Sequence, residues 1–136
     1  MRSLPYPGKS PTRLMSLVLV AFLLLPVAAL RAAEAPPEVE RLMLQQIDAV
    51  AANDHAAFIQ NGNRAFRELM DAWSFDSIVM QRRARLAEGY RLEYLGMITR
   101  LGMSEYLWRV LPQEYSYHYL GHLSLADGKV VGFMLE

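Results

Sequence analysis

The spacing of apolar residues changes once along the chain, from about every 3.6 residues to every second residue, near Gly89. Before Gly89 the apolar positions recur as on one face of a helix, and after it they alternate with polar positions as in a half-buried strand. Helices followed by strands, rather than the two in alternation, are typical of the α+β class. We therefore expect three to four N-terminal helices packed on a curved four-stranded antiparallel sheet.

The helical half is expected to hold short helices separated by polar breaks. Pro36-Pro37 suit the first turn of a helix whose apolar stripe covers residues 39–50. Asp54 is placed to cap a second helix. Apolar residues within 66–73 mark a third helix, which includes Trp73, and Ser74 is placed to cap a fourth.

The second half predicts a meander, because its connections are too short for parallel crossovers. Asp127-Gly128 is the kind of dipeptide that type I′ hairpin turns prefer. Gly96 and Gly121 lie inside predicted strands, where glycine marks a bend or bulge, so the sheet should be strongly curved. The expected strands are Tyr90–Leu101, Met103–Leu111, Tyr115–Leu125 and Lys129–Leu135.

Alternation places one row of apolar and aromatic side chains on the sheet face that meets the helices, with Ile98 and Val131 among them. Buried phenol and indole groups need hydrogen-bond partners, and Gln46 and Asp48 are the obvious ones on the facing helix. The rings either fill the core with their polar tips at its rim, or line a pocket for a small apolar or peptide ligand. The candidate pocket residues are Tyr94, Tyr106, Trp108, Tyr117 and Tyr119.

The front of the chain has the pattern of an export signal. Arg2, Lys9 and Arg13 precede an apolar run over residues 14–30, and small residues follow that run. The run is near the short limit for a membrane span, so an uncleaved anchor is the alternative. Pro26 and the lack of a basic cluster after the run favour cleavage.

We therefore expect a signal peptide over residues 1–33, cut somewhere within 29–35, and a mature domain over residues 36–136. The mature protein should be periplasmic or secreted, and should meet a membrane only through the leader before cleavage. The chain has no cysteine, which excludes disulfides and a lipid anchor on cysteine.

Charge excludes one class of partner. The leader holds four basic residues and no acidic one, and removing these from the chain's 14 basic residues leaves 10 against 14 acidic ones. A mildly acidic domain without a basic face argues against nucleic acid as a partner. Arg82, Arg83 and Arg85 form the one local basic cluster, which we interpret as a solvated helix face rather than an anion site.

No constellation of residues dictates a chemistry. His118 and His122 lie four residues apart on one predicted strand, about 13 Å along it, which is too far for both to bind one metal ion. We interpret them as part of a solvated outer face or a dimer contact. Asp48 and Asp71 could act as bases in a pocket, but surface helix positions explain them equally well. We assign no catalytic residue, metal ligand or cofactor.

Several structural motifs carry a resemblance to a known family. They are Gly89-Tyr90, Tyr94-Leu95-Gly96, Tyr106-Leu107-Trp108-Arg109 and residues 123–133, which follow a helical front half. In this arrangement the chain, from about Val39 to its end, resembles small exported bacterial domains of unknown function in the nuclear transport factor 2-like, or cystatin-like, superfamily. The resemblance implies a conical α+β domain, a cavity between helices and sheet, and a homodimer formed through the sheet.

The resemblance also implies two possible uses of the cavity. Some members catalyse reactions there with an Asp–His or Asp–Tyr pair, whereas many others bind or assemble, and the sequence does not reveal such a pair. We therefore expect a non-catalytic binding or assembly module of the bacterial envelope, whose partner is a protein or a small apolar or peptide ligand. The alternative is a small enzyme that uses an acid–base pair in the cone-shaped cavity.

Overall fold

A computed structural model describes residues 33–136, so the predicted leader and its cleavage site lie outside the described residues. Within residues 33–136 no helix has both the length and the apolar character of a membrane span. The helices of this part come first and the strands follow, as the change of hydrophobic period predicts. The elements are α2 (Pro37–Ala52), α3 (His55–Ile59), α4 (Arg64–Leu69), α5 (Ala72–Leu86), β1 (Tyr90–Arg100), β2 (Met103–Pro112), β3 (Tyr119–Ala126) and β4 (Lys129–Leu135).

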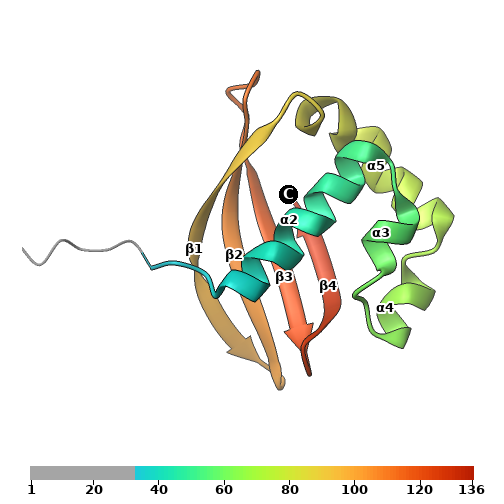
Figure 1. The fold of residues 1–136 in the computed structure, drawn as a ribbon, viewed down its shortest axis with the longest axis vertical. Helices are drawn as coiled ribbons and strands as arrows, with labels where there is room; N and C mark the ends of the chain where they lie inside the picture. The colour runs from blue at the N-terminus through green and yellow to red at the C-terminus, as the bar shows by residue number, and fades with distance from the viewer. Residues whose placement is uncertain (1–32) are drawn as a thin grey trace, which may run out of the picture. The chain divides into compact units, whose positions relative to one another are not determined.

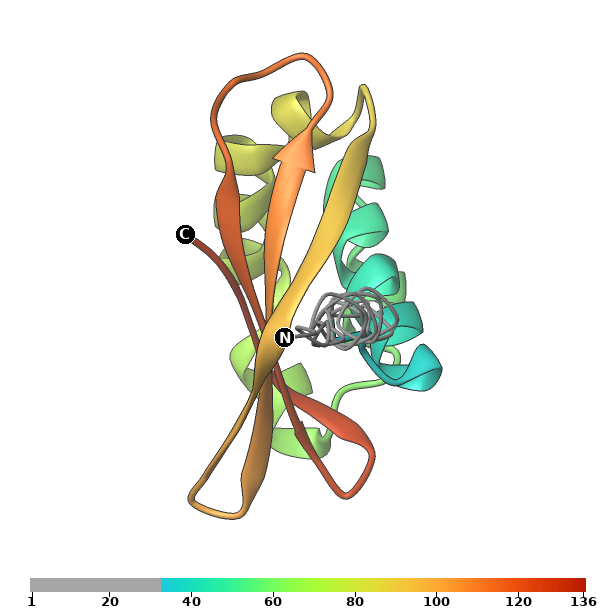
Figure 2. The ribbon, with the colours of Figure 1, turned by 90° about the vertical axis from the view of Figure 1, so that its left-hand side faces the viewer.

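The strands form one antiparallel sheet in the order β1-β2-β3-β4, which confirms the predicted α+β class and meander. Helix α2 crosses one face of the sheet, and α3, α4 and α5 are stacked on the side of β4 (Figure 1). The strands twist strongly from one end to the other (Figure 2), as expected from the glycines inside them. We call the face toward α2 the inner face and the opposite one the outer face.

Polar side chains cap the N-termini of three of the helices. The carboxylate of Asp54 accepts a hydrogen bond from the Ala57 amide, as the sequence predicts, and Asn63 caps α4 in the same way. The cap of α5 is Asp71, whose carboxylate accepts from the amide of Ser74, so the prediction of Ser74 as the cap is wrong. Because α5 begins earlier than expected, Trp73 belongs to it and is exposed to solvent.

One strand begins later than the sequence predicts. The third strand starts at Tyr119 rather than Tyr115, and residues 115–118 belong to the loop that follows β2. The last strand has the predicted bounds. Asp127 and Gly128 both have positive φ, 49° and 72°, which is the type I′ conformation that their dipeptide favours.

This hairpin supports a stability prediction. Gly128→Val should lower the free energy of unfolding by about 1–2 kcal/mol, because a β-branched residue is strained at positive φ. A Cβ at Gly128 would meet no atom within 4 Å, so the loss would come from the backbone rather than from a clash. Lys129→Val places the same side chain on the next, exposed residue and is the control. A urea titration compares the two, and equal midpoints would contradict the turn assignment.

Bulges in β1 and β4 change which side chains face the core. The pairing of β1 with β2 shifts between Tyr94 and Gly96, as expected for a glycine inside a strand. Beyond the shift the alternation is reversed, so that Ile98 is exposed rather than inward as predicted. A second shift, opposite Ser124 and Leu125, leaves Val131 half-buried and buries Val130 in its place.

Gly121 was predicted to mark a bend or bulge, and it marks no bulge, because β3 keeps its register with β2 there. This glycine instead allows α2 to lie close to the sheet. A Cβ at Gly121 would be 2.4 Å from Cε of Met43 and 3.0 Å from Cγ2 of Val110. Met43 and Val110 are both fully buried, so the space between α2 and the middle of the sheet is filled with side chains.

A cluster of phenylalanines joins the small helices to the last strand. Phe58 is fully buried, and its ring centroid lies 4.9 Å from Phe75, 5.7 Å from Phe66 and 5.4 Å from Phe133. The amide nitrogen of the buried Gln46 donates to the Phe58 carbonyl at 2.8 Å, which fixes α2 to α3. These rings come from α3, α4, α5 and β4, and they belong to the same hydrophobic core as Met43 and Val110.

Candidate functional site

Three of the five candidate aromatic residues form a row on the inner face. The Trp108 ring centroid lies 5.4 Å from that of Tyr94 and 6.2 Å from that of Tyr106. Trp108 is 1% exposed, whereas the two tyrosines flanking it are half-buried. Burial raises the pKa of Tyr94, and the neighbouring Tyr106 raises it further, so this phenol is neutral at physiological pH. The row therefore has a core residue in the middle and amphipathic rings on both sides.

The other two aromatic residues lie apart from this row. Tyr119 is buried at the start of β3, and Tyr117 belongs to the preceding loop and is exposed, with the two ring centroids 5.1 Å apart. They lie near the end of the sheet opposite the β1–β2 and β3–β4 hairpin turns. The structure therefore does not bring all five rings to one pocket, because β3 begins too late to carry Tyr117.

Two arginines of the predicted solvated cluster bind the sheet instead. The guanidinium of Arg82 donates to the Leu135 carbonyl at 2.7 and 3.0 Å, and Arg85 donates to the Tyr119 hydroxyl at 3.3 Å. Arg85 also lies over the Tyr117 ring, 5.1 Å from its centroid. Interpreting these side chains as a solvated face is wrong for Arg82 and Arg85, which fasten α5 to the sheet, whereas Arg83 is exposed.

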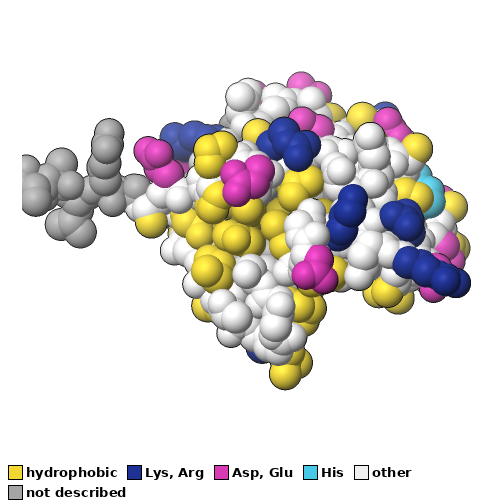
Figure 3. Space-filling model, turned by 60° about the horizontal axis from the view of Figure 1, so that its bottom comes forward, with side chains coloured by type: hydrophobic (Ala, Val, Ile, Leu, Met, Phe, Trp, Pro, Cys, Tyr) yellow, Lys and Arg dark blue, Asp and Glu magenta, His cyan; other side chains and the backbone are white. Residues whose placement is uncertain are grey.

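A groove opens between α2 and the hairpin end of the sheet. It has a volume of about 370 Å³ and lies between the first turns of α2 and the tips of the two β-hairpins. Figure 3 looks at this end and shows apolar side chains gathered in the middle of the face, with acidic and basic ones around them. We call it the hairpin-tip groove; Leu42, Tyr106 and Leu125 contribute apolar side chains to it, and Glu38, Arg41 and Asp127 contribute charges.

The hairpin-tip groove includes one candidate residue, Tyr106, and several residues that sequence reasoning missed. Leu42 was predicted as part of the apolar stripe of the first helix, Leu125 as part of the inward-facing row of the sheet, and Asp127-Gly128 as a turn. Nothing in their spacing signals that they meet, because residues 38–42 and 125–128 are distant in sequence. Only the crossing of α2 over the sheet brings them together.

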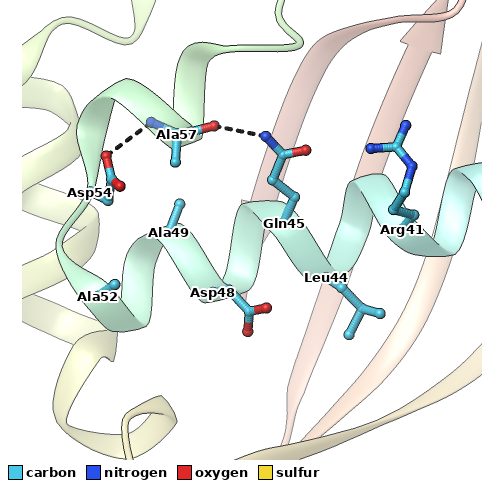
Figure 4. A pocket seen from close by; sticks show the side chains of 8 residues that line it. All are labelled: Arg41, Leu44, Gln45, Asp48, Ala49, Ala52, Asp54 and Ala57. Atoms are coloured by element: carbon cyan, nitrogen blue, oxygen red, sulfur yellow. Dashed lines mark hydrogen bonds between the residues drawn. The ribbon is translucent and has the colours of Figure 1, made fainter.

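A shallower groove lies between α2 and α3, with a volume of about 430 Å³. Alanines, polar side chains and Leu44 line it. Figure 4 shows Gln45 turned toward α3, where it donates to the Ala57 carbonyl, and Asp48 turned away. Asp48 accepts a hydrogen bond from the Tyr90 hydroxyl at 2.6 Å. The structure thus pairs Asp48 with Tyr90 rather than with the predicted aromatic row.

The Asp48–Tyr90 pair has limited capacity for proton transfer. Burial raises the pKa of Tyr90, and its hydrogen bond to Asp48 raises it further, so the phenol keeps its proton at physiological pH. Its O–H is already donated to the carboxylate, and Asp48 itself is exposed. The geometry is that of a link between α2 and β1. Asp71, the other candidate base, is the exposed cap of α5 and lines neither groove.

His122 lies on the outer face with a carboxylate at each ring nitrogen. Nδ1 is 2.8 Å from Glu105 and Nε2 is 2.9 Å from Glu136. His118 is in the loop before β3, so the prediction that the two histidines lie on one strand is wrong. Across residues 33–136, no group of three or more His, Asp or Glu side chains is arranged to hold a metal ion.

Comparison of the chain with models of known protein families gave no match, and comparison with curated proteins gave none.

Proposed function

We propose that this protein is a non-catalytic binding module of the bacterial envelope, which binds an apolar or peptide ligand in the hairpin-tip groove. Export rests on the leader pattern of residues 1–33. We also propose that the chain is a member of the nuclear transport factor 2-like superfamily. The order of its elements, helices followed by a curved antiparallel sheet, supports this. The resemblance alone would be compatible with either binding or catalysis.

The observation that carries the proposal is that side chains fill the space between α2 and the middle of the sheet, whereas a groove is open at the hairpin end. Met43, Trp108 and Val110 occupy the filled space and are almost completely buried, so a ligand would have to displace well-packed side chains to enter. At the hairpin end, Tyr106 instead forms part of the wall of an open groove. Space for a ligand therefore lies at the hairpin end of the sheet.

The lining of the groove favours a peptide with an apolar side chain. Its volume of about 370 Å³ is in the range typical of small-ligand sites. Leu42, Tyr106 and Leu125 can contact an apolar side chain, and the Tyr106 ring can add a polar contact through its hydroxyl. Glu38 and Arg41 are suited to hydrogen bonds with the amides and carbonyls of a peptide backbone.

An enzyme with an acid–base pair is the second candidate. The observation in its favour is the 2.6 Å hydrogen bond between Tyr90 and Asp48. It ranks second because the raised pKa of Tyr90 makes this phenol a poor acid and leaves no phenolate to act as a base.

Selection from a random peptide library tests the binding proposal. Peptides selected on the wild-type chain should bind Tyr106→Ala at least about tenfold more weakly, since loss of an aromatic hot-spot residue costs about 2 kcal/mol or more and about 1.4 kcal/mol is tenfold in affinity. Ser104→Trp should weaken binding similarly, because Ser104 lines the groove and a large ring would occupy it. Affinities are measured by isothermal titration calorimetry.

Tyr117→Ala is the matched control, because it removes the same type of side chain from an exposed loop outside the groove. It should leave the affinity unchanged. Circular dichroism shows that each variant is folded before its affinity is compared. Peptides that bind Tyr106→Ala and Ser104→Trp as tightly as the wild type would contradict the hairpin-tip groove as the binding site.

A further inference from the structure

The three arginines near the C-terminal end of α5 have no carboxylate partner in the described part of the chain. Four other arginines of residues 33–136 each pair with a glutamate, whereas none of the ion pairs there includes Arg82, Arg83 or Arg85. Arg82 donates to the Leu135 carbonyl, and Arg83 is exposed to solvent. This end of α5 therefore carries positive charge that is not paired within residues 33–136.

Three tyrosines hold the guanidinium of Arg85. It donates to the Tyr119 hydroxyl at 3.3 Å, and it lies 5.1 Å from the ring centroid of Tyr117 and 6.0 Å from that of Tyr115. The tyrosines occupy every second position of residues 115–119, so one short segment supplies all of these contacts. Cation–π contacts and a neutral hydroxyl fix the position of the guanidinium, but they leave its charge unpaired.

This cluster is open to solvent. The side chains of Tyr115 and Tyr117 are 43% and 51% exposed. Within residues 33–136, Tyr119 is the one hydrogen-bond acceptor for the N–H donors of Arg85. We call Arg85, Tyr115 and Tyr117 the arginine–tyrosine platform. It lies where α5 ends and the loop between β2 and β3 stands, at the end of the sheet opposite the hairpin tips (Figure 1, Figure 2).

We propose that the arginine–tyrosine platform binds an acidic saccharide, that is, a sugar ring that carries a carboxylate. Arg85 donates to Tyr119 through Nη1, which leaves Nε and Nη2 as a fork that matches a planar carboxylate. The rings of Tyr115 and Tyr117 have partly negative faces, which attract the polarised C–H groups on the flat side of a sugar ring. The platform lies outside the hairpin-tip groove, so this site goes beyond the function proposed above.

The composition of the platform favours this class of ligand over others. A small inorganic anion would pair with Arg85 but leave both tyrosine rings uncovered, whereas an apolar ligand would cover the rings and bury an unpaired charge, which is costly. Ser116 and His118, on either side of Tyr117 in the sequence, are exposed and polar, so they are suited to hydrogen bonds with sugar hydroxyls. An acidic peptide has the carboxylate but no comparable row of hydroxyls, and is expected to bind more weakly.

A titration followed by nuclear magnetic resonance tests the class of ligand. The isotope-labelled full-length chain is titrated with tetragalacturonic acid, an oligomer of a six-membered sugar acid. The fully methyl-esterified form of this oligomer keeps the rings but lacks the charge, and it is the control ligand. The acid should shift the amide signals of residues 115–119. The ester should bind at least about tenfold more weakly, because it cannot form the ion pair with Arg85.

Variants test the residues of the platform. Arg85→Gln should weaken binding of the acid at least about tenfold, and Tyr117→Ala at least about fivefold. Arg83→Gln is the matched control, because it removes the same charge from an exposed position of the same helix, and it should weaken binding less than about twofold. Circular dichroism shows whether each variant is folded. Tyr117 is an exposed loop residue, so its variant decides the test if Arg85→Gln does not fold.

The saccharide site and the hairpin-tip groove can fail independently, because Tyr106→Ala should bind tetragalacturonic acid as tightly as the wild type. Three results would overturn the saccharide site. They are unchanged signals of residues 115–119, equal affinities for the acid and the ester, and equal weakening by Arg83→Gln and Arg85→Gln. A glutamate-rich peptide that shifts the same signals at a lower concentration than the oligosaccharide would also overturn it, and would assign the platform to a protein partner.

Discussion

Replacing Trp108 by alanine is expected to lower the free energy of unfolding by about 3–5 kcal/mol. The indole is 1% exposed and lies against Tyr94 and Tyr106 on the inner face, so its removal leaves a cavity that these neighbours only partly refill. Small domains are stable by about 5–15 kcal/mol, and with no cysteine this one has no disulfide to limit the loss. A guanidinium titration followed by circular dichroism measures the change.

The chain provides its own control for this substitution. Trp73, on α5, is 78% exposed, so Trp73→Ala should change the free energy of unfolding by no more than about 0.5 kcal/mol. Both substitutions remove the same side chain, so the difference between their unfolding free energies measures the effect of burying the indole. A loss below about 1 kcal/mol for Trp108→Ala would contradict a filled core and favour the interpretation of Trp108 as the wall of a ligand cavity.

Phe58→Ala is expected to be similarly destabilising, by about 3–5 kcal/mol, but for a different part of the core. The ring contacts Phe66, Phe75 and Phe133, so its loss removes packing from three neighbouring elements at once. Because α3 and α4 are too short to persist alone, they depend on this packing. Thermal unfolding by calorimetry should show a lower midpoint.

Leu69→Ala is the control for this cluster, because Leu69 is in α4 but exposed. It should move the midpoint little. Hydrogen exchange adds a local test, because amides of α3 and α4 should lose protection in Phe58→Ala before those of β2 and β3. Equal loss of protection throughout the sheet would contradict the role of this cluster in holding the small helices.

The helices show where local sequence is sufficient and where it is not. Asp54 caps α3 as predicted, since a carboxylate at this position can reach the amide three residues on. The pattern predicted Ser74 as the cap of α5, whereas Asp71, an equally good capping residue three positions earlier, is the cap in the structure. In the structure α5 begins before Trp73, which leaves that indole in solvent.

In the strands, strict alternation of inward and outward residues predicts the facing of a side chain only where no bulge interrupts the strand. Alternation correctly placed Tyr106 and Trp108 inside, because β2 and β3 pair without a shift over these residues. Ile98 and Val131 were misplaced, because one extra residue in a strand reverses every later position. Gly96 marked the first bulge, whereas the second has no glycine at its extra residue.

The sequence by itself determined the class of the fold, the strand order and the presence of aromatic rings on the inner face, because these follow from periodicity, short connections and turn residues. Only the tertiary structure decided which rings fill the core, that Tyr90 binds Asp48, and that Arg85 lies against the loop tyrosines. It also showed that the hairpin-tip groove is open and that, among residues 33–136, backbone and side-chain groups cover one edge of the sheet and not the other. These features join residues far apart in sequence, and they depend on how α2 crosses the sheet, which local spacing does not encode.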